Sequence, residues 1–322
     1  MPVQQTVTIP TYCIIWRNPG STNDAKVQTF IEALERAKLT NVYCITVDTS
    51  KLAASKQRLI RLLNKHANDC WLLVSGGDGT VGSVINILKK SSLTKTPPIL
   101  PLPAGNSNDI ATMLHGKRML TVKRLANARK QPVHIMECNL QAPGHKAHVQ
   151  YAAAYISFGI TAQTAKSINL PAHRNSQTDQ QGEASRRIKE VRRFSNVLSQ
   201  AKPFHITEDN QERILYERIL VNGRRMAKYF RLPAELSEAA FRDIAISDYS
   251  PLSNLKHLSM LATKQLHGIV RQRGETVQFT CNEPIMSQFD GETLAIQKET
   301  TLTIRVDESP LTFISLVTHS RS

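Results

Sequence analysis

Residues 70–80 read CWLLVSGGDGT, and residues 81–90 continue as VGSVINILKK. Four consecutive apolar residues at 71–74 are typical of an interior strand of a parallel sheet, because both faces of such a strand are covered. The three glycines within residues 76–79 allow positive φ angles and carry no Cβ to hold a bulky anion away from the backbone. The helix that we expect to begin near Thr80 adds unpaired N–H groups and the positive end of its dipole. The stretch therefore predicts a strand, a phosphate-binding loop and a helix.

Asp78 lies inside this loop. A carboxylate repels a neighbouring phosphate unless a divalent cation lies between them or the acid takes up a proton during a reaction, and kinases use both arrangements. A tight strand-to-helix turn in which Asp78 caps the helix would explain the same residues without any ligand. The loop alone leaves both interpretations open, and two later motifs bear on the choice.

Apolar strands alternate with amphipathic helices in the N-terminal part of the chain. We expect strands at 12–16, 42–47, 71–74 and 99–102 and helices at 23–38 and 51–67. Short connections between these elements predict a doubly wound parallel α/β sheet, whose ligands bind beyond the carboxyl ends of the strands. The residues that follow such strand ends are Asn18, Thr46, Gly76 to Thr80 and Gly105 to Asp109.

The pattern changes from about Val133 onwards. Alternating strand-like segments at 133–140, 148–158 and 275–280 predict an antiparallel β domain. A polar loop at 171–183 and a basic segment at 186–202 interrupt it. The basic segment predicts a helix that lies on a membrane surface or grips phosphates, and a solvated helix face over a small apolar stripe explains it equally well.

Composition excludes some classes of protein. The chain has 322 residues, 41% of them hydrophobic and 21% charged, and no apolar run approaches the ~18 to 20 residues of a membrane span. The N-terminus MPVQQTVTIP lacks the pattern of a secretion signal, so we expect a cytoplasmic protein. A formal net charge of +15 favours polyanionic partners such as nucleic acid, anionic lipid or nucleotide. Aromatic residues make up only 6%, and no basic stretch interleaves with stacking residues, which argues against nucleic acid.

Two further motifs follow the first. Residues 100–111 read LPLPAGNSNDIA, in which Ser107 or Asn106 could cap a helix that has Asp109 in its first turn. Residues 287–292 read SQFDGE, which places two carboxylates around a glycine and alone would predict a hairpin turn.

Taken in order, NPG at 18–20, GGDGT at 76–80, LPAGNSND at 102–109 and FDGE at 289–292 resemble the diacylglycerol kinase catalytic-domain family. This family of lipid kinases includes bacterial soluble diacylglycerol kinases and is related to sphingosine kinases. The resemblance extends from Asn18 to about Val306. It implies a nucleotide-binding α/β domain at 1–132, an antiparallel β-sandwich domain at 133–300 and a C-terminal strand or tail at 301–322 that returns to the first domain. The active site would lie in the cleft between the domains.

The resemblance also implies a reaction: ATP- and Mg²⁺-dependent transfer of the γ-phosphate to a lipid hydroxyl, with diacylglycerol converted to phosphatidic acid as the leading expectation. The partners would be a lipid with a free hydroxyl and the surface of an anionic membrane. The nucleotide-binding residues would be Asn18, Thr46, Gly76, Gly77, Asp78, Gly79, Thr80 and Asn106. Asp78 and Asp109 would organise magnesium and phosphates. Asp290 and Glu292 would serve the acceptor, and the general base would be Asp290, Glu292 or Asp78.

The chain departs from the family pattern at several positions. Asn106 stands where threonine is common, and Ala239 and Ala240 stand where many bacterial members have an Asp-Gly pair that helps to hold a structural magnesium. We therefore expect this second metal site to be absent or rebuilt around Glu238. Two other functions remain alternatives: an NAD kinase, which shares the GGDGT loop but is disfavoured by the motifs at 102–109 and 289–292, and a catalytically silent lipid- or nucleotide-binding protein.

Overall fold

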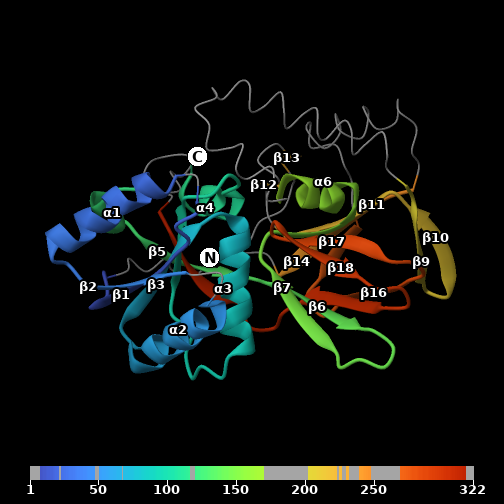
Figure 1. Ribbon diagram of the computed structural model, residues 1–322, viewed down its shortest axis with the longest axis horizontal. Coiled ribbons are helices and arrows are strands. Elements are labelled where there is room, and N and C mark those ends of the chain that lie inside the picture. Colours follow the sequence, from blue (N-terminus) through green and yellow to red (C-terminus); the bar gives the residue numbers. More distant parts are fainter. Residues whose placement is uncertain are drawn as a thin grey trace.

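The structure is a computed structural model that describes residues 8–21, 23–47, 51–66, 68–116, 120–169, 202–222, 225–226, 230–231, 239–247 and 269–316. Glu238, the loop at 171–183 and the basic segment up to residue 201 lie outside the described residues, so the expectations attached to them stay predictions. Figure 1 shows an α/β half and a β half, with helix α3 (Asp78–Lys90) standing between them.

The α/β half is built on one twisted sheet. In spatial order its strands are β2 (Asn41–Thr46), β1 (Tyr12–Arg17), β3 (Cys70–Gly76), β4 (Ile99–Pro103), β20 (Leu311–Ser315) and β5 (Arg129–Val133). All neighbouring strands are parallel except β20 and β5. The helices of this half are α1 (Asp24–Ala37), α2 (Leu52–His66), α3, α4 (Asp109–His115) and α5 (Val122–Leu125).

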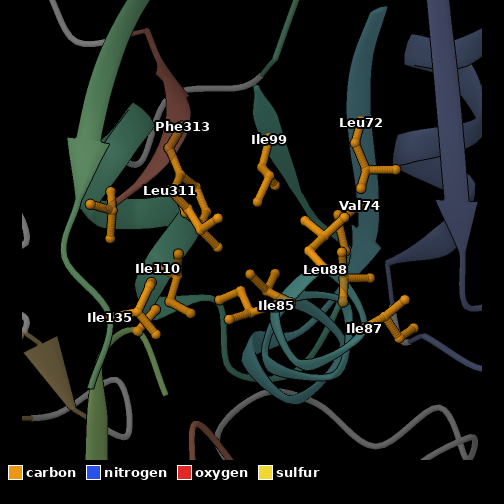
Figure 2. Close-up of a cluster of buried hydrophobic side chains, with 14 of the residues drawn as sticks. Leu72, Val74, Ile85, Ile87, Leu88, Ile99, Ile110, Ile135, Leu311 and Phe313 are labelled. Carbon is orange, nitrogen blue, oxygen red and sulfur yellow. The ribbon is translucent and has the colours of Figure 1, made fainter. Parts of the chain in front are cut away.

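Helices cover both faces of this sheet, which confirms the doubly wound arrangement. On one face α1 packs Phe30 and Leu34 against Trp71 of β3, and on the other face α2 and α3 pack against Leu72 and Val74. Strand β3 is buried along its whole length, as expected for an apolar strand with helices on both sides. Figure 2 shows Leu72 and Val74 facing Ile85 and Leu88 of α3, with Ile99 and Phe313 of the neighbouring strands beside them.

The β half contains two antiparallel sheets. One has the strand order β10 (Gln211–Leu215), β9 (Phe204–Glu208), β16 (Thr276–Cys281), β19 (Thr301–Val306), β6 (Met136–Gln141) and β7 (His148–Ala152). The other has the order β15 (Ile269–Gln272), β14 (Ala240–Ile246), β11 (Glu217–Val221), β8 (Tyr155–Gly159), β17 (Ile285–Phe289) and β18 (Glu292–Ile296). A short pair, β12 (Arg225–Met226) and β13 (Phe230–Arg231), and helix α6 (Ile160–Asn169) complete the described elements.

The two sheets share one apolar core, as a β-sandwich does. The ring of Phe158 from β8 meets the edge of Phe279 from β16 at a centroid distance of 5.4 Å. The predicted antiparallel β domain is thereby confirmed.

Two of the expected strands are broken in the structure. The segment 133–140 divides between β5 and β6, which belong to different sheets, and 148–158 divides between β7 and β8, which lie in opposite sheets of the sandwich. The second break falls at Ala153 and Ala154, both fully buried, whose small side chains let the chain cross between the sheets inside the core that joins the two halves. One continuous strand over 148–158 was therefore a wrong expectation.

The last two strands of the described chain belong to different halves. Strand β19 pairs with β16 and β6 in the sandwich, whereas β20 inserts between β4 and β5 of the first sheet. The three ranges expected for the domains, 1–132, 133–300 and 301–322, stay a prediction. Among the described residues, no helix combines the length and the apolar character that crossing a bilayer requires.

Candidate active site

Two loops lie backbone against backbone at the carboxyl ends of β3 and β4. A Cβ on Gly105 would lie 2.2 Å from the Cα of Gly77, and a Cβ on Gly77 would lie 2.8 Å from the carbonyl oxygen of Ser107. The N–H of Asp78 donates to that same carbonyl at 3.0 Å. The glycines within 76–79 have no positive φ, so the loop does not use the left-handed conformations that glycine allows. Glycine is needed at 77 and 105 because the two loops touch.

Asp78 links the two loops through its side chain. Its carboxylate accepts the backbone N–H groups of Asp109 at 2.9 Å and Ile110 at 3.0 Å, so it caps helix α4. The residue that precedes α4, Asn108, makes no side-chain cap and instead bonds to the N–H and carbonyl of Gly105. The N-cap position of α4 is thus Asn108 and neither Asn106 nor Ser107, and Asp78 caps α4 and not its own helix as the alternative interpretation had it.

The environment of Asp78 favours its neutral form. The side chain is only 2% exposed, and burial together with the nearby charge of Asp109 raises its pKa to about 7, although its hydrogen bonds lower the pKa in part. Ser107 donates from its hydroxyl to Asp109 at 3.4 Å. A cation placed beside Asp78 and Asp109 would relieve the repulsion between them.

Asn18 and Thr80 meet beside the first loop although 62 positions separate them. The amide of Asn18 donates to the hydroxyl of Thr80 at 3.5 Å, and the backbone N–H of Asn18 donates to the carbonyl of Ser75 at 3.0 Å. Thr46 is exposed at the end of β2, in register with Arg17, one residue before Asn18. Asn106 is half-buried in the second loop. The expected nucleotide-binding residues thus follow neighbouring strand ends of one sheet.

The third motif reaches the same place from the β half. Asp290 and Gly291 form the turn between β17 and β18 with φ angles of 47° and 97°, the positive pair that tight hairpins require. This turn lies against α3, where a Cβ on Gly82 would come 3.3 Å from the Cβ of Asp290 and a Cβ on Gly79 would come 3.2 Å from the Cγ of Glu292. Glycines three positions apart share one helix face, and here they admit the hairpin.

Asp290 is a fully buried carboxylate held by three consecutive backbone N–H groups. Ala153 donates to Oδ2 at 2.6 Å, and Ala154 and Tyr155 donate to Oδ1 at 2.9 and 3.0 Å. Burial raises its pKa to about 6, and the three hydrogen bonds counteract part of that rise. Asp290 is therefore mostly ionised at neutral pH and retains enough basicity to accept a proton.

Glu292 has a different environment from its neighbour in the motif. Its exposed side chain borders a pocket of about 320 Å³ between α2, α3, β7 and β18. The walls of this pocket desolvate the carboxylate and raise its pKa, while the ammonium groups of Lys56 and Lys90 lower it.

Sequence reasoning missed Tyr155. Gln288 donates to its hydroxyl at 3.1 Å, and burial followed by the charges of Asp78, Asp290 and Asp109 raises its pKa. The tyrosine thus lies among the acids of all three motifs. The run of three alanines at 152–154, which breaks the strand alternation just before it, was the signal available in the sequence.

The acidic residues suit magnesium better than a metal that needs a closed protein cage. Within the ranges that the structure describes, no group of three or more His, Cys, Asp or Glu side chains is arranged around a common metal position. Mg²⁺ commonly takes one or two carboxylates and completes its shell with water and substrate phosphates. Asp78 and Asp109, beside the glycine-rich loop 76–80, supply two such carboxylates.

Comparison with known proteins gives the following matches. Residues 13–138 match the family model "Diacylglycerol kinase catalytic domain". Diacylglycerol kinase iota of Mus musculus and of Homo sapiens is 46% identical over 44 residues, which cover 14% of this chain and only 4% of those proteins. Among solved structures, a diacylglycerol kinase from Bacillus anthracis str. Sterne has a TM-score of 0.66 at 13% identity over 97% of this chain and 98% of its own. Yeast NADH kinase complexed with NADH has a TM-score of 0.57 at 11% identity over 98% and 87%. At these identities the two structures show a shared fold.

Proposed function

We propose, from the match of residues 13–138 to the diacylglycerol kinase catalytic domain, that the chain is a lipid kinase that transfers the γ-phosphate of ATP to a lipid hydroxyl, with diacylglycerol as acceptor. One observation carries this proposal. Loops 76–80, 105–109 and 290–292, distant in sequence and contributed by both halves, meet at the first turns of α3.

The nucleotide binds to the α/β half. The phosphates bind at the loop of Gly76, Gly77 and Gly79, where the dipole at the N-terminus of α3 attracts them. Asn18 and Thr80, already in contact, bind beside this loop, and Thr46 and Asn106 bind the same nucleotide from the neighbouring strand ends.

Asp109 and Asp78 would hold magnesium. The ion, when bound, neutralises charge on the phosphoryl group during transfer. Asp78 also positions Asp109, because its carboxylate holds the N–H of Asp109 at 2.9 Å. One residue thus serves both the metal and the geometry of the second loop.

Asp290 is the general base. A carboxylate can accept about four hydrogen bonds, and three N–H groups occupy Asp290, which leaves one position for the acceptor hydroxyl. Its pKa of about 6 suits a base near neutral pH, and the three N–H groups fix its orientation. Glu292, on the next strand, orients the bound substrates from the accessible side.

The lipid requires contact with a membrane. A net charge of +15 attracts anionic headgroups, and each basic residue near such a surface contributes about 1 kcal/mol. We propose peripheral association at the cytoplasmic face of the membrane.

Transfer of labelled phosphate tests this function. The protein is incubated with γ-labelled ATP and Mg²⁺ in mixed micelles that contain diacylglycerol, phosphatidylglycerol, ceramide or a long-chain base, and in parallel with NAD. Label in diacylglycerol is the expected result. Label in NAD alone would make the chain a nicotinamide-nucleotide kinase, which the fold shared with yeast NADH kinase allows, and absence of label in every acceptor would make it a silent binder.

A further inference from the structure

The pocket that Glu292 borders has a positively charged wall. Lys56 of α2 and Lys90 at the end of α3 line it together, with Ile60 and Ile87 as apolar walls. Its volume of about 320 Å³ lies within the range of small-molecule sites. Lys90 follows Asp78 by twelve residues in one helix, so the two lie about 18 Å apart along its axis. This end of the pocket is therefore separate from the loop proposed to hold the transferred phosphate.

Two successive lysines of α3 have different partners. Lys89 forms an ion pair with Asp307 at 2.9 Å and donates to the carbonyl of Ser309 at 2.5 Å. Lys90 donates to the neutral side chain of Gln150 at 3.3 Å. Within the described part of the chain, no carboxylate lies within ion-pair distance of Lys90 or Lys56. Lys89 thus joins the two halves. The charges of Lys90 and Lys56 are not neutralised by an ion pair with any described residue and are available to an anionic ligand.

The lysines also repel one another. Burial lowers the pKa of Lys90, the charge of Lys56 lowers it further, and Glu292 opposes both effects. A bound anion would reduce this repulsion. On its own side of the pocket, the carboxylate of Glu292 repels anionic groups. A ligand that places a hydroxyl next to Glu292 and its anionic group next to the lysines therefore fits best.

The wall behind the lysines is fixed. The side-chain amide of Asn86 donates to the carbonyls of Gly82 and Tyr151, both at 2.9 Å, and its oxygen accepts the N–H of Tyr151 at 3.1 Å. This bridge ties α3 to β7 next to Gln150. The position of Lys90 relative to the β half is therefore set before any ligand binds, which reduces the entropy cost of binding.

We propose that this pocket binds a phosphate group of a hydroxyl-bearing phosphate ester, with the phosphate between the ammonium groups of Lys56 and Lys90 and the hydroxyl near Glu292. Lysine recognises phosphate as a mobile point charge, and two lysines on separate helices supply two such charges. The site goes beyond the proposed transfer reaction: it shares Glu292 with that reaction, but its two lysines have no part in the transfer.

Calorimetric titration with inorganic phosphate, without ATP, tests the site. The variants are Lys56→Gln and Lys90→Gln, and the control is Lys65→Gln, an equal charge change at an exposed position of α2. We expect each pocket variant to bind phosphate about tenfold more weakly, as for loss of one charged hydrogen bond, and the control to bind like the wild type. Glu292→Gln, which removes the repelling carboxylate, should bind several-fold more tightly. Equal phosphate affinity in wild type, Lys56→Gln and Lys90→Gln, or no binding by wild type, would overturn the proposal.

A second titration identifies the source of the phosphate. Vesicles of phosphatidylcholine with phosphatidylglycerol are compared with vesicles of phosphatidylcholine alone. If the two variants lose phosphate binding and also binding to the phosphatidylglycerol vesicles, the ligand is a lipid headgroup. If they lose only phosphate binding, it is a free phosphate ester. Because neither titration measures transfer, failure of this proposal and failure of the kinase proposal are separate results.

Discussion

Asp78 and Asp290 are buried carboxylates that both accept backbone N–H groups, yet their surroundings differ. Asp78 caps α4 with the charge of Asp109 nearby, whereas Asp290 joins a hairpin tip to the crossing between β7 and β8. The pKa is raised to about 7 in the first and to about 6 in the second. Burial is the largest cause of both pKa rises. The charge of Asp109 raises the pKa of Asp78 further.

Replacement of Asp78 should reveal its structural role. Asp78→Ala leaves the N–H groups of Asp109 and Ile110 buried without an acceptor, which should lower the free energy of unfolding by roughly 2–4 kcal/mol. Asp78→Asn keeps one acceptor oxygen and should cost about half as much. Urea unfolding followed by circular dichroism measures both, with the exposed Glu35→Ala as control. Wild-type stability in Asp78→Ala would show that the cap contributes nothing.

Glu217 should make stability depend on pH. This buried glutamate accepts the N–H of Thr161 at 2.9 Å at the start of α6, and burial raises its pKa from 4.5 to about 8. The folded state then binds the proton more tightly than the unfolded state, so the stabilisation is fully present below pH 4.5 and is lost as the pH rises through about 8. Between these limits the wild type should lose up to about 1.4 kcal/mol per pH unit relative to Glu217→Gln. Parallel stability curves for the two proteins would contradict this expectation.

Two glycines on one face of helix α3, Gly79 and Gly82, let the hairpin at 290–292 pack against the helix. Gly82→Ala would ordinarily stabilise a helix by about 0.5–1 kcal/mol. Its new Cβ, however, would lie 3.3 Å from Asp290, which three hydrogen bonds prevent from moving. We expect kcat to fall at least tenfold, as for about 1.4 kcal/mol of lost transition-state stabilisation, with little change in stability. Ser83→Ala, the next position on α3, is the control. Wild-type kcat in Gly82→Ala would show that the hairpin at 290–292 moves to accommodate the new Cβ without loss of function.

Most of the elements around the site follow from local sequence. The apolar run 71–74 and its glycine turn predict β3 and α3, and the alternation with helices predicts the parallel sheet, because these signals are periodic over one element. The turn at Asp290 and Gly291 is equally local. The cap of α4 was not predictable, since its acceptor, Asp78, lies 31 positions earlier in the chain. The crossing at Ala153 and Ala154 was missed because small residues permit either a strand or a break.

The two halves form one body around α3. Asn86 bonds to the backbone of Tyr151, Lys89 pairs with Asp307, and a single apolar core runs from Leu72 and Ile85 to Tyr155 and Ile219. The return of β20 into the first sheet adds a covalent connection. The sequence motifs indicated that distant loops cooperate, but pairings of this kind depend on tertiary packing, which no single motif encodes.

The rate of phosphate transfer to diacylglycerol, measured as kcat/KM from about pH 5 to 8 for wild type and Asp290→Asn, tests the role of Asp290 most directly. Wild-type kcat/KM should fall tenfold per pH unit below about pH 6, because the base is then protonated. Asp290→Asn should lose about 100-fold or more and should lack this acid limb. A wild-type profile that is flat over this range, or full activity in folded Asp290→Asn, would show that Asp290 is not the base.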